Sequence, residues 1–226
     1  MNDFSLYFGL GTDHILTWEA LDHILFVAAL CLRYGWKDWK KVAVLVTAFT
    51  IGHSITLALS ALNYIQVPVK WIEFLVPITI ALTAINNILA QPAGQRKKLP
   101  LIYFFALFFG LIHGLAYASS FLDLEGKEGL VPHLFAFNLG IELAQLVVVA
   151  AVLFASYLLT DLLKISRIGW IRVASLLILA VALNMAIQRF PHKKNTHHEK
   201  TVFVAFRDSF CVQYTHCTEY PEQSGV

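Results

Sequence analysis

Six long apolar segments dominate the chain and restrict it to folds that suit a lipid bilayer. They cover residues 17–34, 42–62, 71–90, 99–121, 133–157 and 169–189. Each approaches the roughly 20 mostly apolar residues that a spanning helix needs. The chain is 58% hydrophobic and only 14% charged, whereas soluble domains carry about 25% charged residues. We therefore expect an all-α, polytopic transmembrane bundle of about six spanning helices, preceded by an N-terminal interfacial helix.

Charge and composition divide the chain into two parts and exclude one class of partner. Residues 1–190 are expected to form the transmembrane helical domain, and residues 191–226 a polar C-terminal tail. The adjacent His197 and His198 in this tail lack a fixed geometry and make a weak metal site, so we interpret the tail as solvated. The net charge is +2, and the basic residues stand at segment ends rather than in a patch. Nucleic-acid binding is therefore excluded, and the lipid bilayer is the expected surrounding.

The loops predict an orientation. Basic residues concentrate after the first, third and fifth apolar segments, namely at Arg33, Lys37, Lys40, Lys41, Arg96, Lys97, Lys98, Lys164 and Arg167. Loops rich in Lys and Arg stay in the cytoplasm, so these three are expected to be cytoplasmic. Lys193 and Lys194 follow the last segment and oppose this pattern, but the three loops outweigh them. We expect a multi-pass protein of the bacterial inner membrane with both termini on the extracytoplasmic side.

Ionisable residues interrupt the apolar segments at positions where charge is costly. They are Asp22, His23, His53, Glu73, His113 and Glu142. A single histidine in a spanning helix often does no more than hydrogen-bond a neighbour, but charged groups at this depth usually line a pathway, a proton relay or a metal site. With the orientation above, all six fall in the outer half of the membrane. One shared site explains them better than six independent accidents.

Other polar residues recur at helical spacing beside the ionisable ones. Thr50 lies one turn before His53, and Asn138 and Gln145 flank Glu142 on one helix face. With Ser54 they are expected to form a supporting polar shell. Their hydroxyl and amide groups can also bond within their own helix, which is the plainer interpretation of the threonines.

The types of residue in this set favour a divalent transition metal. Imidazole and carboxylate groups together suit zinc, nickel, cobalt or manganese, whereas calcium and magnesium prefer oxygen ligands and copper(I) prefers sulfur. Asp22 and His23 are adjacent and project about 100° apart on a helix. One of them can therefore bind the ion while the other supports a ligand or a neighbouring helix.

Several motifs, in order along residues 9–190, resemble one known family. They are HIL at 14–16, LDHILF at 21–26, TAFTIGHSITLALS, WIEFLVPITIALTAINN, FGLIHGLAYASSF and FNLGIELAQL. The chain resembles the HupE/UreJ proteins, hydrogenase and urease accessory membrane proteins. The resemblance implies an inner-membrane permease for nickel, with zinc or cobalt as alternatives. By the same resemblance His14, Asp22 and His23 correspond to a metal motif in the first helix, and His53, Glu73, His113 and Glu142 match the other polar signatures.

These observations predict a secondary transporter, or permease, for a divalent transition metal. The ion is expected to be captured near His14, Asp22 and Glu73, to pass His53 and His113, and to leave past Glu142. The alternative is an intramembrane zinc-dependent hydrolase that holds zinc on His23, His53 and His113. It would use Asp22 or Glu73 as base and Ser54 or Ser119 beside the reacting carbonyl. A purely structural partner subunit is a third interpretation, and homo-oligomerisation is left open.

Overall fold

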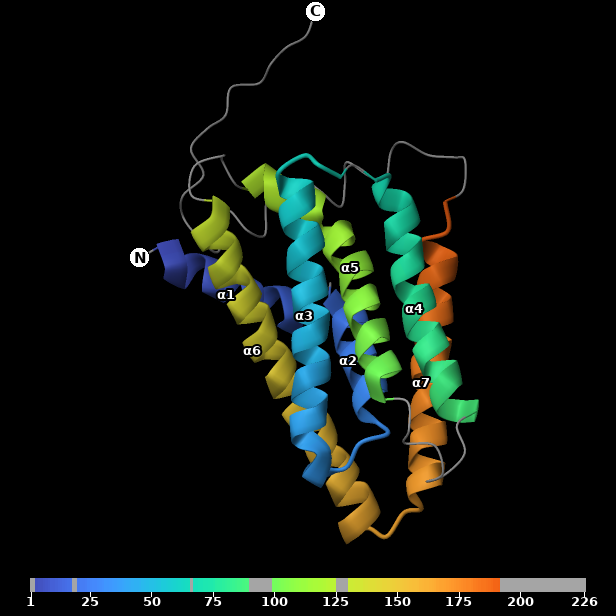
Figure 1. Cartoon of the computed structure of the whole chain (residues 1–226). Coiled ribbons are helices and arrows are strands. Elements are labelled where there is room, and N and C mark those ends of the chain that lie inside the picture. Colours follow the sequence, from blue (N-terminus) through green and yellow to red (C-terminus); the bar gives the residue numbers. More distant parts are fainter. Residues whose placement is uncertain (1–2, 18–19, 66, 90–98, 125–129, 192–226) are drawn as a thin grey trace, which may run out of the picture. The chain divides into compact units, whose positions relative to one another are not determined.

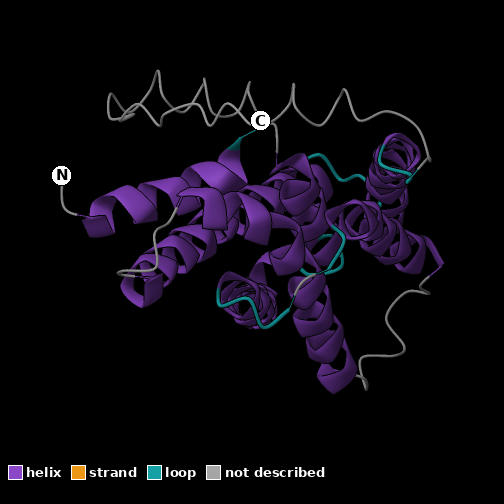
Figure 2. Cartoon of the chain, turned by 90° about the horizontal axis from the view of Figure 1, so that it is seen from above, coloured by secondary structure: helices purple, strands orange, loops and turns teal. Residues whose placement is uncertain are grey.

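The structure is a computed structural model that describes residues 3–17, 20–65, 67–89, 99–124 and 130–191, with side chains omitted at 99–102 and 117–124. Within these residues every regular element is a helix, as Figure 2 shows. The main helices are α1 (Asp3–Leu16), α2 (Leu21–Cys31), α3 (Trp39–Ala61), α4 (Val69–Leu89), α5 (Leu99–Leu124), α6 (Leu130–Tyr157) and α7 (Arg167–Gln188). The all-α prediction is confirmed.

The chain divides by its internal contacts into Met1–Pro191 and His192–Val226. The second unit contains the predicted polar tail with His197 and His198, and it lies outside the described residues. The remaining description therefore concerns the first unit alone.

Four helical stretches are long and apolar enough to cross a membrane, as the sequence predicted. They are Trp36–Ala61, Val69–Leu89, Leu130–Leu162 and Arg167–Gln188. The first of these begins with a 3-10 turn, Trp36–Asp38, and the third ends with a π-helical turn, Leu158–Leu162. The backbone of α5 is helical throughout, but side chains are described for its middle, where Tyr103–Ala116 is a shorter apolar helix. The protein is thus a membrane protein with several spanning helices.

The first predicted segment, 17–34, is not a single helix. Only α2 lies within it, and its 11 residues extend for about 17 Å at about 1.5 Å per residue, too little to cross a bilayer alone. The axes of α1 and α2 differ by 70°, and the bent pair has the length and composition of a broken span or of a re-entrant loop. The count of six spans was therefore approximate: among the described residues four helices qualify by themselves, and the number is five if the bent pair is counted as one span.

Helix α1, at the N-terminus, packs into the core of the bundle. Figure 1 shows it lying across the upright helices, with its C-terminal end directed into the bundle. It packs mainly against α6, and Ile15 at this end is fully buried. A methyl group on Gly11 would collide with the carbonyl oxygen of Phe137 on α6, so this glycine permits the close crossing. This packing places His14, which precedes Ile15, at the inner end of α1.

Helices α3 and α5 form the most extensive helix pair in the bundle. Their backbones approach so closely that a methyl group on Gly52 would collide with the carbonyl oxygen of Leu107, and one on Gly110 with that of Phe49. Small residues at helix interfaces allow such approach in membranes. This packing fixes the position of His53 on α3 relative to His113 on α5.

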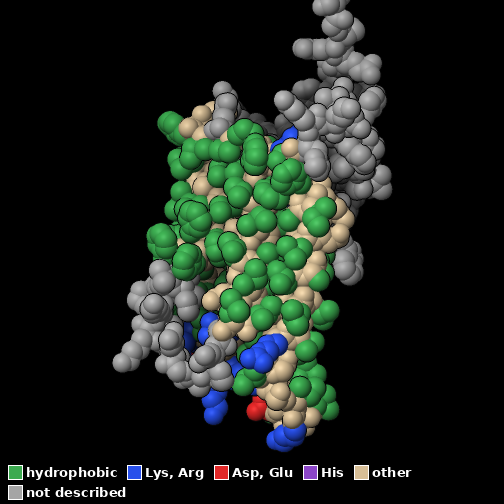
Figure 3. Space-filling view, turned by 90° about the vertical axis from the view of Figure 1, so that its right-hand side faces the viewer, with side chains coloured by type: hydrophobic (Ala, Val, Ile, Leu, Met, Phe, Trp, Pro, Cys, Tyr) green, Lys and Arg blue, Asp and Glu red, His purple; other side chains and the backbone are tan. Residues whose placement is uncertain are grey.

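Basic side chains gather at one end of the bundle. Figure 3 shows hydrophobic side chains over the middle of one face and Lys and Arg toward its lower end. There the guanidinium group of Arg167, at the start of α7, donates to the carbonyl oxygen of Arg33 at 3.1 Å. Lys41 also pairs with Asp38, at 2.7 Å. The loop after α2 and the loop before α7 therefore meet at the same end, which we call the basic end.

Candidate metal centre

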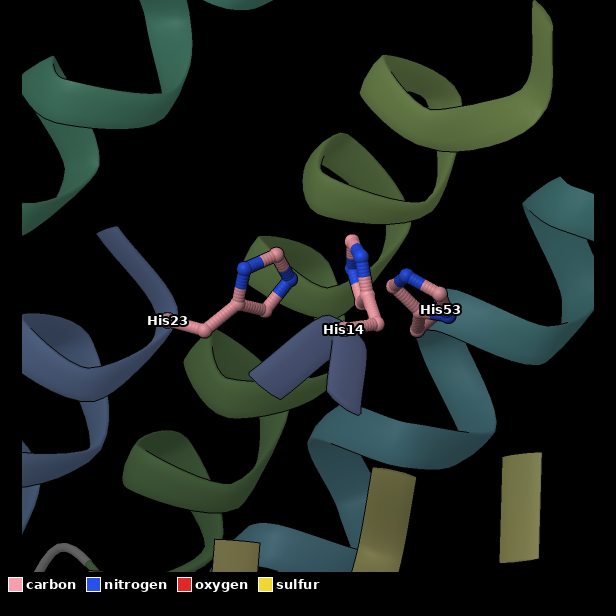
Figure 4. Close-up of side chains that lie close together, drawn as sticks. All are labelled: His14, His23 and His53. Carbon is pink, nitrogen blue, oxygen red and sulfur yellow. The ribbon is translucent and has the colours of Figure 1, made fainter. Parts of the chain in front are cut away.

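Four histidines from four helices meet in the interior of the bundle. They are His14 on α1, His23 on α2, His53 on α3 and His113 on α5. Ligand atoms of His14, His23 and His53 all lie within 4.8 Å of one another, and Figure 4 shows the three rings facing a common space. The ring of His113 lies 5.1 Å from that of His23, measured between centroids. We call these four residues the histidine cluster.

The ring of His23 is oriented by the residue that precedes it. Its Nδ1 lies 2.9 Å from Oδ1 of Asp22, and its backbone N–H donates to the same oxygen at 2.8 Å. Both residues are buried, with 8% and 5% of their surfaces exposed for Asp22 and His23 respectively. Since a carboxylate only accepts hydrogen bonds, Nδ1 carries the proton. The nitrogen left for a ligand is then Nε2.

His113 and His53 are each held through Nδ1 as well. Nδ1 of His113 donates to the backbone carbonyl oxygen of Phe109 at 2.9 Å. Nδ1 of His53 lies 3.4 Å from Oδ1 of Asn138, a long contact. The amide of Asn138 is itself oriented, because its Nδ2 donates to the carbonyl oxygen of Leu134 at 2.8 Å. Both partners are acceptors, so in these rings too the lone pair belongs to Nε2.

The free ring nitrogens point to a ligand. The Nε2 atoms of His23, His53 and His113 are buried, and none has a hydrogen-bond partner among the described residues. A buried polar atom without a partner costs about 1–3 kcal/mol. Three such atoms in one cluster are difficult to explain as structural histidines. Histidines that bind metals have this pattern, in which one ring nitrogen donates to an acceptor and the other is left for the ion.

The donors suit a borderline divalent ion. Imidazole nitrogen is a common ligand of zinc, nickel, copper and iron. Bonds of about 2.0–2.1 Å to a zinc-sized ion would draw the ligand atoms of His14, His23 and His53 somewhat closer than their present spacing within 4.8 Å. Described residues thus provide three nitrogens in reach of one ion and a fourth nearby on His113.

The sequence comparison supplies the family. The profile of the HupE / UreJ protein family matches residues 1–189, which include every residue of the histidine cluster. The chain belongs to the HupE/UreJ family. This confirms the resemblance noted in the sequence and associates the membrane protein with metal handling. No curated protein and no solved structure matches in the corresponding searches.

In this HupE/UreJ protein, two further predicted site residues lie on α6 and face α3. Oε1 of Glu142 accepts a 2.6 Å hydrogen bond from Thr47. Oε1 of Gln145 accepts one of 3.0 Å from Thr50, and Gln145 is fully buried. With the contact between His53 and Asn138, these pairs form a polar seam along α3 and α6. The predicted supporting positions Thr50, Asn138 and Gln145 are thus brought together.

The structure distributes the other predicted residues differently. Glu73, near the start of α4, is exposed and is not a member of the histidine group. The Ser54 hydroxyl donates to the carbonyl oxygen of Thr50 in its own helix, at 2.7 Å. The side chain of Ser119 lies outside the described residues. His14, predicted as part of an outer capture point, instead joins His23 and His53 in one group.

Sequence reasoning missed one residue of the site. Nη1 of Arg189, the residue that follows α7, lies 3.0 Å from Oδ2 of Asp22. An arginine at the end of an apolar helix is usually an interface residue, so nothing in the sequence distinguished it. The one signal in the sequence was Asp22 itself, because a carboxylate at hydrophobic depth requires a partner.

Asn138→Leu is expected to weaken metal binding by about tenfold, the lower end of the usual cost of losing a partner that orients a ligand, because its contact with His53 is long at 3.4 Å. Leucine is similar in size but cannot accept the proton of His53 Nδ1, so the ring loses its fixed orientation. Titration of the purified protein with nickel in competition with a coloured chelator measures this change. The same replacement at Asn184, an exposed residue on α7, serves as the control, and equal affinity in both variants would contradict the proposed support.

Proposed function

We propose that this HupE/UreJ protein is a permease for a divalent transition metal, with nickel as the first candidate and zinc or cobalt as alternatives. The observation that carries the proposal is the histidine cluster. Three of its Nε2 atoms, on three different helices, are buried without hydrogen-bond partners among the described residues. A transporter needs a site that binds its cargo inside the membrane and exchanges it readily. The metal ion is then the substrate of the protein and not a resident cofactor.

The position of the cluster supports uptake from outside. Asp22 pairs with Arg189 at the end of α7, whereas Arg167 at the start of α7 bonds with Arg33 at the basic end. The histidine cluster therefore lies toward the end opposite the basic loops. If these loops face the cytoplasm, as their charge predicts, the cluster is nearer to the extracytoplasmic side of the inner membrane, with both termini of the helical domain on that side.

The polar seam offers a route for release. It begins at His53 and Asn138 and continues through the pair of Thr47 and Glu142, about one to two helical turns further toward the basic end. Glu142 provides a carboxylate, and hydroxyl and amide oxygens accompany it. We propose that the ion leaves the imidazoles along this seam. No nucleotide-binding motif occurs in the sequence, so we expect transport down a gradient or coupled to an ion gradient.

Uptake into proteoliposomes tests the proposal. Nickel, zinc, cobalt and manganese are offered separately to the native chain, to His23→Ala and to His133→Ala. His133 is a histidine of α6 outside the cluster, where it stacks on Tyr7. We expect saturable uptake of one metal that His23→Ala abolishes and His133→Ala preserves. Absence of flux, with a stoichiometric metal that stays bound through purification, would reject the permease and favour the zinc-dependent hydrolase.

A further inference from the structure

A single carboxylate joins Arg189 to the histidine cluster. One oxygen of Asp22 lies 2.9 Å from Nδ1 of His23, and the other lies 3.0 Å from Nη1 of Arg189. The Asp22 side chain is 11% exposed and the Arg189 side chain 30% exposed. Arg189 thus lies between the buried carboxylate and the surroundings of the bundle. Arg189 contacts Asp22, which orients His23. Among the described residues, no hydrogen bond joins Arg189 to an imidazole ring.

The site gains positive charge when an ion binds. Without an ion, the charges of Asp22 and Arg189 balance each other. A divalent ion bound to the cluster adds two positive charges to a site that Arg189 reaches through Asp22 and His23, and the guanidinium group repels these charges. Arg189 also donates a hydrogen bond to the Asp22 carboxylate. A carboxylate shared in this way pulls less on the Nδ1 proton of His23 and makes Nε2 a weaker donor to the ion.

We propose that Arg189 lowers the metal affinity of the histidine cluster and so speeds release of the ion. The proposal rests on the function proposed above, namely that the cluster binds the cargo. A site with three imidazoles in reach of an ion and a fourth nearby, supported by the Asp22 carboxylate, would otherwise hold a transition metal in the manner of a structural centre. The positive charge of Arg189 keeps binding weak enough for passage.

A purely structural role for Arg189 makes a different prediction. The end of α7 has another anchor, because Phe190 packs edge-to-face on Phe74 of α4 with 5.3 Å between ring centroids. If the ion pair only fastened α7 to α2, its loss would lower the melting temperature and leave metal affinity unchanged or weaker. If Arg189 tunes the site, its loss makes binding tighter.

The experiment compares nickel affinity and dissociation rate in purified protein for the native chain, R189Q, R189K and R172Q. R189Q removes the charge, R189K keeps it, and R172Q removes a charge from an exposed position near the other end of the same helix. We expect R189Q to bind nickel about tenfold more tightly or better, with slower dissociation. R189K and R172Q should stay close to the native values.

Two results are decisive against the inference. Equal or weaker nickel affinity in R189Q overturns it, and so does tighter binding that R172Q reproduces. If R189Q folds poorly, R189M removes the same charge with an apolar side chain, and its affinity is judged by the same criterion. A native chain that binds none of nickel, zinc, cobalt or manganese would instead reject the proposed function, so the two failures are distinguishable.

Discussion

Metal-free protein carrying His53→Leu is expected to melt at the same temperature as the native chain or higher, while its nickel affinity falls more than about a hundredfold. His53 is fully buried, and its Nε2 has no partner among the described residues. Leucine removes this unsatisfied atom, whose burial costs about 1–3 kcal/mol. In return the variant gives up the interaction with Asn138, which at 3.4 Å is long and weak. Loss of a direct ligand should exceed the 10- to 100-fold cost of losing a supporting residue.

The measurement is a pair of melting curves with and without nickel. Nickel should raise the melting temperature of the native chain, because a ligand that binds only the folded state stabilises it, and should leave His53→Leu unchanged. A histidine kept for structure would give the opposite pattern, namely a lower melting temperature without metal. That result, with nickel binding intact, would sink the assignment of His53 as a ligand. His133→Leu is the control outside the cluster, and nickel should still raise its melting temperature.

The sequence predicted the helices well because the bilayer imposes a simple rule. Every backbone polar group of a spanning segment must be bonded internally, so a long apolar run becomes a helix whatever its neighbours are. The predicted segments 42–62, 71–90, 133–157 and 169–189 each correspond to a candidate span within a few residues. The segment 17–34 failed because hydropathy measures length and composition and carries no information about a bend between two shorter helices.

Three members of the candidate site stood out in the sequence for a related reason. Charge at hydrophobic depth is costly, so His23, His53 and His113 were conspicuous in the sequence, and all three belong to the histidine cluster. The sequence gives the depth of a residue along its helix, however, and not the side of the helix that faces the core or the angle between two helices. Glu73 therefore seemed equivalent to the histidines although it is exposed near the start of α4. The position of His14 depended on the 70° angle between α1 and α2.

Gly114→Ala is expected to damage both the fold and the metal site. A methyl group at this position would collide with the carbonyl oxygen of His53 and with Oγ1 of Thr56, and would lie 2.9 Å from Cα of His53. Backbone atoms cannot yield as a flexible side chain does, so α5 must move away from α3. Overpacking of this kind usually costs about 1–3 kcal/mol. We expect a value at the upper end, because the His53 atoms belong to the backbone of a packed helix.

Gly9→Ala is the matched control for this effect. It makes the same change in a helix, but nothing lies within 4 Å of the added methyl group, so alanine should stabilise the protein by up to about 1 kcal/mol through its better helix propensity. Unfolding measurements on both variants give the comparison.

The two variants also separate the fold from the site. Gly114 adjoins His113 in the sequence and contacts the backbone of His53 across the helix interface. A shift of α5 therefore changes the distance between two rings of the histidine cluster. We expect nickel affinity to fall in Gly114→Ala, even at temperatures where the protein is fully folded, and to stay native in Gly9→Ala. Native affinity in a folded Gly114→Ala variant would mean that His113 takes no part in binding, and that the group of His14, His23 and His53 is sufficient.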